Sequence, residues 1–450
     1  MKPSLPKGTR DFLPLQVVKR NFIFNTIEEI FKTYGYLPIE TPTMENLTTL
    51  TGKYGDEGDK LLFKVLNNGD FLSGVDEHAL VAKDSNAALS QISKRGLRYD
   101  LTVPFARFVV MHQNEINFPF KRYQIQQVWR ADRPQKGRYQ EFYQCDVDIV
   151  GSESLMYEAE LVQIYSEVFK KLGVNVKILI NNRKILFGLA EAAGIPDQFM
   201  DMTIAIDKME KIGRDGVFNE MLAKDISHGA AEKVLALLNI NNITDLKVAF
   251  DGFEVGTKGI TELETVYDYL GDSIADLVFD IRLARGLSYY TGCIFEVKVD
   301  TNIHASISMG SIGGGGRYDN LTGTFGLSGV SGVGVSFGAE RIYDVMEELQ
   351  LFPSEITRSI DLFFIALDEE SHKYCFKTVS NLRKNGLACD LYPEAAKMKK
   401  QMAYANARQF SHVAIVGEEE RKNDAIMLKN MLTGEQELKK ISELTQYFSE

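Results

Sequence analysis

Residues 129–148 constrain the fold more than any other segment, because a strongly basic turn is followed there by a strand-like alternation. From Phe142 onward, side chains alternate with a period of two, which is typical of a β-strand with two different faces. The polar face carries Phe142, Gln144, Asp146 and Asp148, and the apolar face carries Tyr143, Cys145, Val147 and Ile149. We therefore predict a hairpin strand with its dry side on a core.

The turn before this strand is rich in cations, and Pro134 and Gly137 favour a bend within it. Its cations are Arg130, Arg133, Lys136 and Arg138. A guanidinium group matches the geometry of phosphate oxygens well. A solvated, charged edge loop is the alternative. The carboxylates of the following strand favour a binding site, because acids beside an apolar layer need cations or donors to offset the cost of burial.

The composition is that of a globular protein large enough for two to four domains, with 450 residues, 44% hydrophobic and 25% charged. The net charge of -11 argues against a general nucleic-acid coat, so any polyanion must meet local basic patches. Residues 361–450 contain 13 basic and 14 acidic residues, which makes this tail the part of the chain most permissive for a polyanion.

Cysteine usage and the amino terminus indicate a cytoplasmic protein without a membrane segment. The four cysteines have no disulfide-framework or metal-type spacing, and the six histidines stand alone. We expect no disulfide and no metal held by dedicated protein ligands. No apolar stretch near the amino terminus has signal-peptide length, and residues 362–367 are too few to span a bilayer.

Helices and strands do not alternate simply in the first 353 residues, which favours an α+β domain on a largely antiparallel sheet flanked by helices. Helices are predicted at 17–34, 105–111, 154–172 and 339–349, and strands at 174–180 and 293–299. Short helices with frequent glycines indicate an inserted helical subdomain. The predicted boundaries are 1–183 and 271–353 for the two parts of the main domain, 184–270 for the insertion and 358–450 for a C-terminal α/β domain.

Within the C-terminal domain, short apolar strands are predicted at 361–367, 388–392 and 413–416, separated by helices at 369–384 and 394–408. A turn at 433–434 and a last helix at 440–448 complete the prediction.

Two further polar segments are candidate binding elements. Asp100 and Thr102 lie two apart, so an extended backbone directs both toward one ammonium group; a turn and helix cap before Pro104 is the alternative. Residues 282–292 combine Arg285, beside a glycine, with Tyr289 and Tyr290, and suit a phosphate, although a surface arginine stacked on a tyrosine is also possible.

The glycine cluster at 310–316 is too dense for structure alone, since four successive glycines lose much backbone entropy on folding. We expect close approach of a ligand, with a flexible turn as the alternative. Neither the dinucleotide fingerprint nor the P-loop pattern is present. A strand of small residues then leads into a helix whose early turn carries Arg341. We expect Arg341 to lie at the base of the site that this strand supports.

In this order, these segments resemble class II aminoacyl-tRNA synthetases, and their details resemble the histidyl-tRNA synthetase family over nearly the whole chain. The second class II motif fits 129–132 and 138–142, and the third fits 332–341. R-G-L-S-Y-Y, G-G-G-R-Y-D and the opening K-G-T-R-D-F-L-P resemble signatures of the histidine enzymes. Asp132 replaces a commoner glutamate, and R-Y-D-L-T replaces R-P-E-G-T.

The resemblance implies activation of L-histidine by ATP, with Mg²⁺ shared among the phosphates, and transfer of histidine to its tRNA. Arg130 and Arg285 are the catalytic residues expected beside the α-phosphate and carboxylate, where positioning and charge suffice without a protein base. The expected ATP contacts are Arg130, Asp132, Arg138, Phe142 and Arg341. The expected histidine contacts are Asp100, Thr102, Arg130, Gln144, Asp148, Arg285, Tyr289 and Tyr290.

The resemblance also implies a homodimer with an interface near Thr41 and Pro42, anticodon binding by the C-terminal domain and acceptor-arm contact by the insertion. A regulatory paralogue that binds histidine or tRNA without aminoacylation is one alternative, and the arginine signature and tail domain argue against it. A class II synthetase for proline, threonine or glycine is another, which Asp148 and R-G-L-S-Y-Y disfavour. A structural nucleic-acid-binding protein is a third, disfavoured by the acidic charge.

Overall fold

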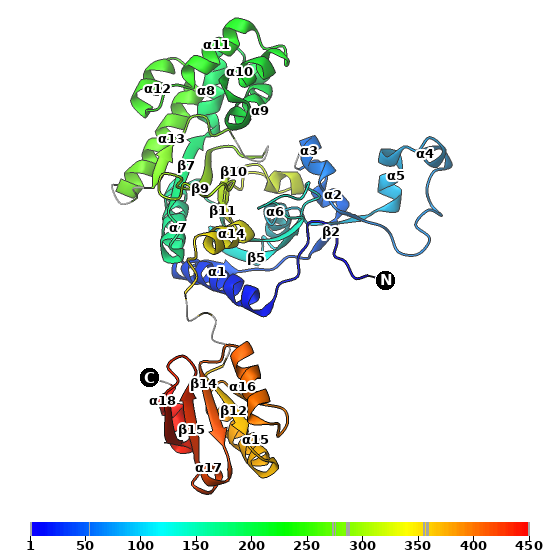
Figure 1. Ribbon diagram of the computed structural model, residues 1–450. Helices are drawn as coiled ribbons and strands as arrows, with labels where there is room; N and C mark the ends of the chain where they lie inside the picture. Colours follow the sequence, from blue (N-terminus) through cyan, green and yellow to red (C-terminus); the bar gives the residue numbers. More distant parts are fainter. Residues whose placement is uncertain are drawn as a thin grey trace. The chain divides into compact units, whose positions relative to one another are not determined.

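The computed structural model divides into two compact units, Met1–Phe352 and Pro353–Glu450, each with a sheet and an apolar core of its own (Figure 1). It describes residues 2–53, 55–271, 274, 276–284, 289–353, 356 and 360–448. No helix within these ranges is long and apolar enough to cross a membrane.

An eight-stranded sheet forms the centre of the first unit, in the order β1-β5-β6-β11-β10-β9-β7-β8. Its strands are β1 (Leu37–Pro38), β5 (Phe120–Trp129), β6 (Glu141–Val150), β7 (Val176–Asn182), β8 (Leu277–Phe279), β9 (Cys293–Val299), β10 (Gly313–Tyr318) and β11 (Gly332–Gly338). Within the described part of this sheet, only the outermost pairs, β1–β5 and β7–β8, are parallel. The predicted, largely antiparallel sheet is therefore confirmed.

Three long helices cover one face of this sheet: α1 (Pro14–Thr33), α7 (Met156–Leu172) and α14 (Ala339–Glu348) (Figure 1). The apolar face of β6 packs beneath them in a continuous core, as the alternation predicted. In α1, buried residues recur at three- and four-residue intervals, from Ile23 to Phe31. Gly173 ends α7 in the left-handed conformation, with φ 72°, which favours glycine.

The polar face is flanked by a smaller layer that contains the sheet β2-β4-β3 and several short helices. Its elements are β2 (Met44–Asn46), α2 (Leu47–Leu50), α3 (Gly55–Lys60), β3 (Lys64–Val65), α4 (Glu77–Val81), α5 (Ser85–Ile92), β4 (Arg95–Leu97), α6 (Thr102–Met111) and a 3-10 helix at Thr322–Phe325. Val103, Phe105 and Val109 of α6 pack with Tyr318 of β10 in a second core cluster. This packing closes one end of the polar face.

Helices fill the stretch between β7 and β8, where short helices were predicted (Figure 1). They are α8 (Arg183–Ala193), a 3-10 helix at Pro196–Gln198, α9 (Phe199–Asp207), α10 (Met209–Leu222), α11 (His228–Leu237), α12 (Ile243–Ala249) and α13 (Glu254–Leu270). α8 and α13 cross closely, because a Cβ on Gly188 would lie 2.7 Å from the Cα of Gly256. Glycine at both positions lets the two backbones touch.

The second unit contains a five-stranded sheet in the order β13-β12-β14-β15-β16, with helices beside it. Its elements are β12 (Leu362–Ala366), α15 (Glu369–Lys384), β13 (Cys389–Leu391), α16 (Met398–Ala407), β14 (His412–Val416), α17 (Glu418–Lys422), β15 (Ala425–Asn430), β16 (Gln436–Lys440), a 3-10 helix at Ile441–Glu443 and α18 (Leu444–Tyr447). The three predicted strands and two predicted helices are present.

The prediction for the end of this unit was wrong in one respect. Residues 425–440 form an antiparallel hairpin, β15 and β16, whose two strands were not predicted, whereas the predicted last helix is present as the 3-10 helix Ile441–Glu443 followed by α18. β16 is an exposed edge strand of mostly charged and polar residues. Its extended conformation comes from pairing with β15, so its own sequence carries little strand signal.

The glycine cluster is not a flexible turn, which corrects that alternative, whereas the close approach of a ligand stays a prediction. Gly313–Gly316 form the first part of β10, in the middle of the sheet. A Cβ on Gly315 would lie 2.2 Å from the carbonyl oxygen of Gly334, and one on Gly316 would lie 2.7 Å from that of Cys293. The neighbouring strands occupy the space that side chains would need.

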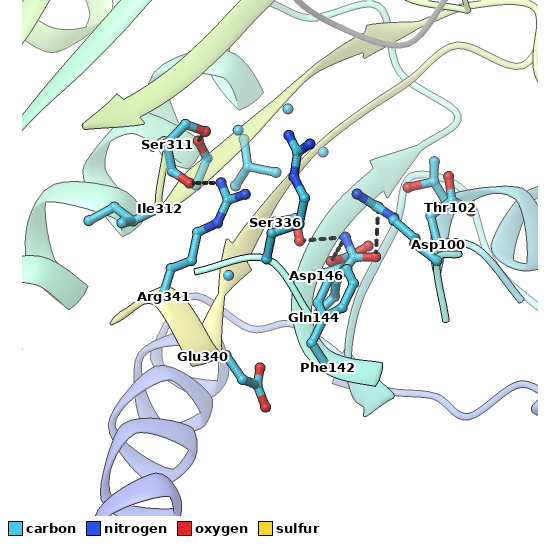
Figure 2. A pocket seen from close by; sticks show the side chains of 18 of the residues that line it. Asp100, Thr102, Phe142, Gln144, Asp146, Ser311, Ile312, Ser336, Glu340 and Arg341 are labelled. Atoms are coloured by element: carbon cyan, nitrogen blue, oxygen red, sulfur yellow. Dashed lines mark hydrogen bonds between the residues drawn. The ribbon is translucent and has the colours of Figure 1, made fainter. Parts of the chain in front are cut away.

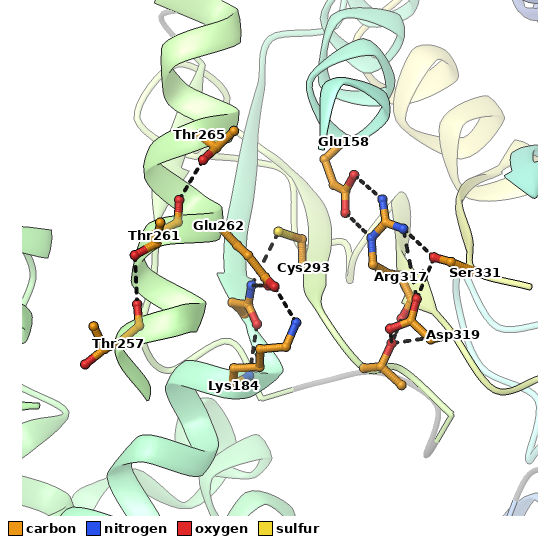
Figure 3. Close-up of polar contacts among 12 residues, drawn as sticks. Glu158, Lys184, Thr257, Thr261, Glu262, Thr265, Cys293, Arg317, Asp319 and Ser331 are labelled. Atoms are coloured by element: carbon orange, nitrogen blue, oxygen red, sulfur yellow. Dashed lines mark hydrogen bonds and ion pairs between the residues drawn. The ribbon is translucent and has the colours of Figure 1, made fainter. Parts of the chain in front are cut away.

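Arg317, directly after the glycines, fastens β10 to α7 (Figure 3). Its Nε and Nη2 each donate to one carboxylate oxygen of Glu158 at 2.6 Å, and its Nη1 donates to Ser331 Oγ at 2.6 Å. The ion pair is bidentate and its two side chains are at most 5% exposed. Because neighbouring strand residues face opposite ways, Tyr318 is directed toward the polar face of the sheet.

Candidate functional site

A cavity of about 300 Å³ lies on the polar face of β6, β10 and β11 (Figure 2). Strand pairing places Asp148 opposite Gly334 and Asp146 opposite Ser336. A Cβ on Gly334 would lie 1.9 Å from Asp148 Oδ1, so the glycine makes room for the carboxylate. The polar side chains of β6 thus lie beside the small residues of β11, and this leaves space for a ligand.

Every predicted site residue within the described ranges lines this cavity. These residues are Asp100, Thr102, Arg130, Asp132, Arg138, Phe142, Gln144, Asp148, Tyr289, Tyr290 and Arg341. Arg285 falls outside the described residues. The fold therefore brings together side chains from the β4–α6 connection, the β5–β6 hairpin, β6, the segment before β9 and the start of α14.

Three arginines line the cavity, and Arg341 lies on the side away from Asp100 and Thr102 (Figure 2). Arg130 Nε donates to the carbonyl oxygen of Tyr99 at 3.0 Å, and its guanidinium lies 5.2 Å from the centre of the Phe142 ring. Arg341 Nε donates to the carbonyl of Gly137 at 2.6 Å. Arg138 Nη1 lies 3.8 Å from Asp132 Oδ1, a loose pairing that leaves its donors in reach of another anion. These arginines suit phosphate oxygens.

Carboxylates line the same cavity. Asp148 Oδ2 pairs with Nη2 of the fully buried Arg122 at 2.8 Å, and Tyr318 OH donates to Asp148 Oδ1 at 2.6 Å. Burial raises the pKa of Asp148, against the opposing effect of Arg122. Burial also raises the pKa of Asp146 to about 7, again opposed by Arg122 and reinforced by Asp148. These carboxylates suit a cation.

Asp100 makes the predicted contact at the helix start and also lines the cavity, where its binding of an ammonium group stays a prediction. Its Oδ1 accepts from the backbone N–H of Val103 at 3.1 Å in the first turn of α6, and its Oδ2 lies 3.5 Å from Tyr289 OH. Thr102 is the first residue of the same helix and lines the cavity. The helix start therefore fixes both polar groups at the cavity wall.

Buried tyrosines add neutral hydrogen-bonding groups beside the acids. Burial raises the pKa of both Tyr290 and Tyr318, and the negative charge of Asp148 raises it further. Both phenols consequently stay protonated at neutral pH and can donate hydrogen bonds.

Asp146, Tyr318 and Ser336 are among the cavity-lining residues that the sequence-based prediction missed. Asp146 had a signal, since it lies between Gln144 and Asp148 on the polar face of the predicted strand. Ser336 accepts from Gln144 Nε2 at 2.9 Å, but this contact depends on the pairing of β6 with β11, which no local pattern reveals. Tyr318 likewise depends on the pairing of β10.

Grouped metal ligands are not found in the described part of the chain, where no three His, Cys, Asp or Glu residues are arranged around a common point.

Comparisons with known proteins agree over nearly the whole length. Residues 88–342 match the family model for histidyl-tRNA synthetase, and residues 361–450 match that for an anticodon binding domain. Histidine–tRNA ligase of Christiangramia forsetii is 54% identical, covering 97% of this chain and 96% of the relative. That of Porphyromonas gingivalis is 55% identical, with 97% of each covered. The crystal structure of histidyl-tRNA synthetase from Nostoc sp. PCC 7120 superposes with a TM-score of 0.81 at 27% identity, covering 100% of this chain and 99% of that one.

Proposed function

Because the chain belongs to the histidyl-tRNA synthetase family, we propose that the cavity on β6 is where it activates L-histidine with ATP. The reaction forms histidyl-adenylate and pyrophosphate, and histidine is then transferred to the 3′ end of histidine tRNA. One observation supports this assignment most directly: a single cavity is lined by both arginines and buried carboxylates. That arrangement complements ATP and the cationic parts of histidine.

At the ATP end, Phe142 stacks on adenine, with Asp132 as its polar contact and Arg138 and Arg341 facing the phosphates. Support comes from the arginines, whose donors are held beside the cavity by backbone carbonyls of fixed position, such as that of Gly137. ATP enters as its Mg²⁺ complex, with the ion bound mainly by the phosphates.

Adenylate formation needs no protein base. A carboxylate oxygen of histidine attacks the α-phosphorus, the new P–O bond forms, and the bond to the bridging oxygen breaks as pyrophosphate leaves with its electron pair. Arg130 neutralises the charge that builds on the α-phosphate and orients the carboxylate. Its location between Gln144 and Phe142 supports this role. Arg285 is proposed as its counterpart from its motif alone.

At the histidine end, Asp100, Thr102 and Gln144 bind the α-ammonium group. Asp148, Tyr289 and Tyr290 line the imidazole pocket, with Asp148 and Tyr290 facing the two ring nitrogens. The support is that Asp148 is already held by Arg122 and Tyr318, so its direction is fixed before the ligand arrives. An amino acid whose side chain lacks matching polar groups would leave the polar groups of this pocket without hydrogen-bond partners and would therefore be rejected.

For the assembly, we propose a homodimer whose interface includes the segment around Thr41 and Pro42. The C-terminal unit binds the anticodon, and the helices between β7 and β8 contact the acceptor arm. By the same family membership, the proposed location is the cytoplasm.

The test is amino-acid-dependent exchange of labelled pyrophosphate into ATP with each of the twenty amino acids. Exchange with histidine alone is expected, and Arg130→Ala should lower it by about 10²-fold or more while the protein stays folded. Histidine binding without exchange would favour the regulatory alternative. Exchange with proline, threonine or glycine instead would assign the chain to another class II synthetase.

A further inference from the structure

The loop between β5 and β6, residues 130–140, carries three residues of the proposed ATP end: Arg130, Asp132 and Arg138. Gln140 braces this loop internally. Its carbonyl accepts from the backbone N–H of Arg130 at 3.0 Å, and its Nε2 donates to the carbonyl of Asp132 at 2.9 Å. Whatever fixes Gln140 therefore fixes two of these residues.

A segment remote in sequence holds Gln140 from outside. We call residues 7–12 the N-terminal strap. The backbone N–H of Gln140 donates to the carbonyl of Gly8 at 2.8 Å. Gly8 has φ +78°, and a Cβ there would lie 2.6 Å from Gln140 Cγ. The strap can approach this closely only because residue 8 is glycine.

Arg10 of the strap holds the adjacent loop residue. Its guanidinium lies 3.5 Å from the centre of the Tyr139 ring, and its Nη1 is 3.7 Å from Asp344 Oδ1 on α14. Tyr139 OH donates to the other oxygen of the same carboxylate at 2.7 Å. Strap, loop and α14 thus meet at one point, and α14 also supplies Arg341, which holds the loop at Gly137.

We propose that the N-terminal strap is a positioning element for the nucleotide end of the site, acting through Gly8 and Arg10 on the loop that carries Asp132 and Arg138. The Arg10 contacts, to Tyr139 and Asp344, bypass Gln140, which holds Arg130, so loss of Arg10 falls on ATP much more than on histidine. This inference rests on the proposed function. It gives the opening motif K-G-T-R-D-F a role in the reaction that the catalytic assignment alone leaves unexplained.

Arg10→Ala tests the proposal, because Arg10 is partly exposed and its loss does not open the core. Lys19→Ala is the matched control. Lys19 lies on α1 and pairs at 2.7 Å with Glu347 of α14, the helix that also carries Asp344, and it contacts no described residue of the loop. In pyrophosphate exchange, Arg10→Ala should raise KM for ATP about 5- to 20-fold and change KM for histidine less than about 2-fold. The control should change neither.

Two further variants separate positioning from general stability. Arg10→Lys keeps the charge near Asp344 without the flat stacking group, so it should recover part of the ATP affinity. Gly8→Ala displaces Gln140, which holds Arg130 and Asp132, so it should raise KM for ATP and, through Arg130, also affect histidine; it serves as the test if Arg10→Ala fails to fold. An unchanged KM for ATP in either variant, or equal changes in both KM values in Arg10→Ala, would overturn the proposal. A wild-type chain without histidine-dependent exchange would overturn the proposed function instead.

Discussion

Asp146 is a carboxylate that lines the cavity and is only 2% exposed. It shares one buried cation, Arg122, with the neighbouring Asp148. Burial raises the pKa of both carboxyls, Arg122 opposes this, and the charge of Asp148 raises the pKa of Asp146 further. Asp146 was not among the predicted site residues, although it lies between Gln144 and Asp148 on the same face of the strand.

Replacing Asp146 should change how stability depends on pH. Its pKa rises from 3.8 to about 7 on folding, so between these values the folded chain holds a proton that the unfolded chain has released. The contribution of Asp146 to the free energy of unfolding should therefore fall as pH rises from about 4 to 7, and level off above.

In Asp146→Asn this contribution should be absent, while the coupled Asp148 keeps its own. Chemical denaturation of both proteins at pH values across this range measures the difference. Parallel curves would contradict the buried, shifted carboxyl.

β10 lies so close to its two neighbouring strands that a side chain at Gly315 or Gly316 would meet their backbone. Its glycines are flanked by β9 and β11, and residues 313–315 also line the cavity. The run thus serves two needs, because the strand must pass close to its neighbours and leave room on its polar face.

Gly315→Ala should destabilise the first unit by about 2–4 kcal/mol, because the new Cβ meets backbone atoms of Gly334 and Val335, which cannot rotate away. Gly229→Ala in α11 is the control: nothing lies within 4 Å of its added Cβ, and alanine favours a helix. Denaturant unfolding should show the loss only for Gly315→Ala. Equal stability of the two variants would mean that the strands separate at little cost.

The whole molecule has apolar cores that do not cross the division between the units. The cores of the first unit draw only on residues before 353, and those of the second only on residues after it. Each unit therefore contains the apolar contacts needed to fold separately.

Residues 1–352 expressed alone should retain histidine-dependent pyrophosphate exchange, since the cavity lies entirely within them. Aminoacylation of tRNA should fall much more, because the matched anticodon binding domain is missing. Comparing both activities with the full chain measures the separation. Loss of exchange together with a normal melting curve would show that the second unit contributes to the site.

The sequence alone determined the elements whose signals are local. Alternation along 142–149 gave the two faces of β6, three- and four-residue spacing gave α1, and glycine gave the end of α7. The motifs located most of the cavity lining, because class II synthetases carry these residues at fixed places in the chain.

Tertiary structure alone decided what depends on the partner of each segment. The glycines of residues 313–316 became a strand because β9 and β11 lie on either side, and β16 became a strand because β15 pairs with it. Ser336, Tyr318 and Gly8 also make their contacts with segments that are distant in sequence. The free energy of such contacts depends on both segments at once, so no short stretch of sequence predicts it.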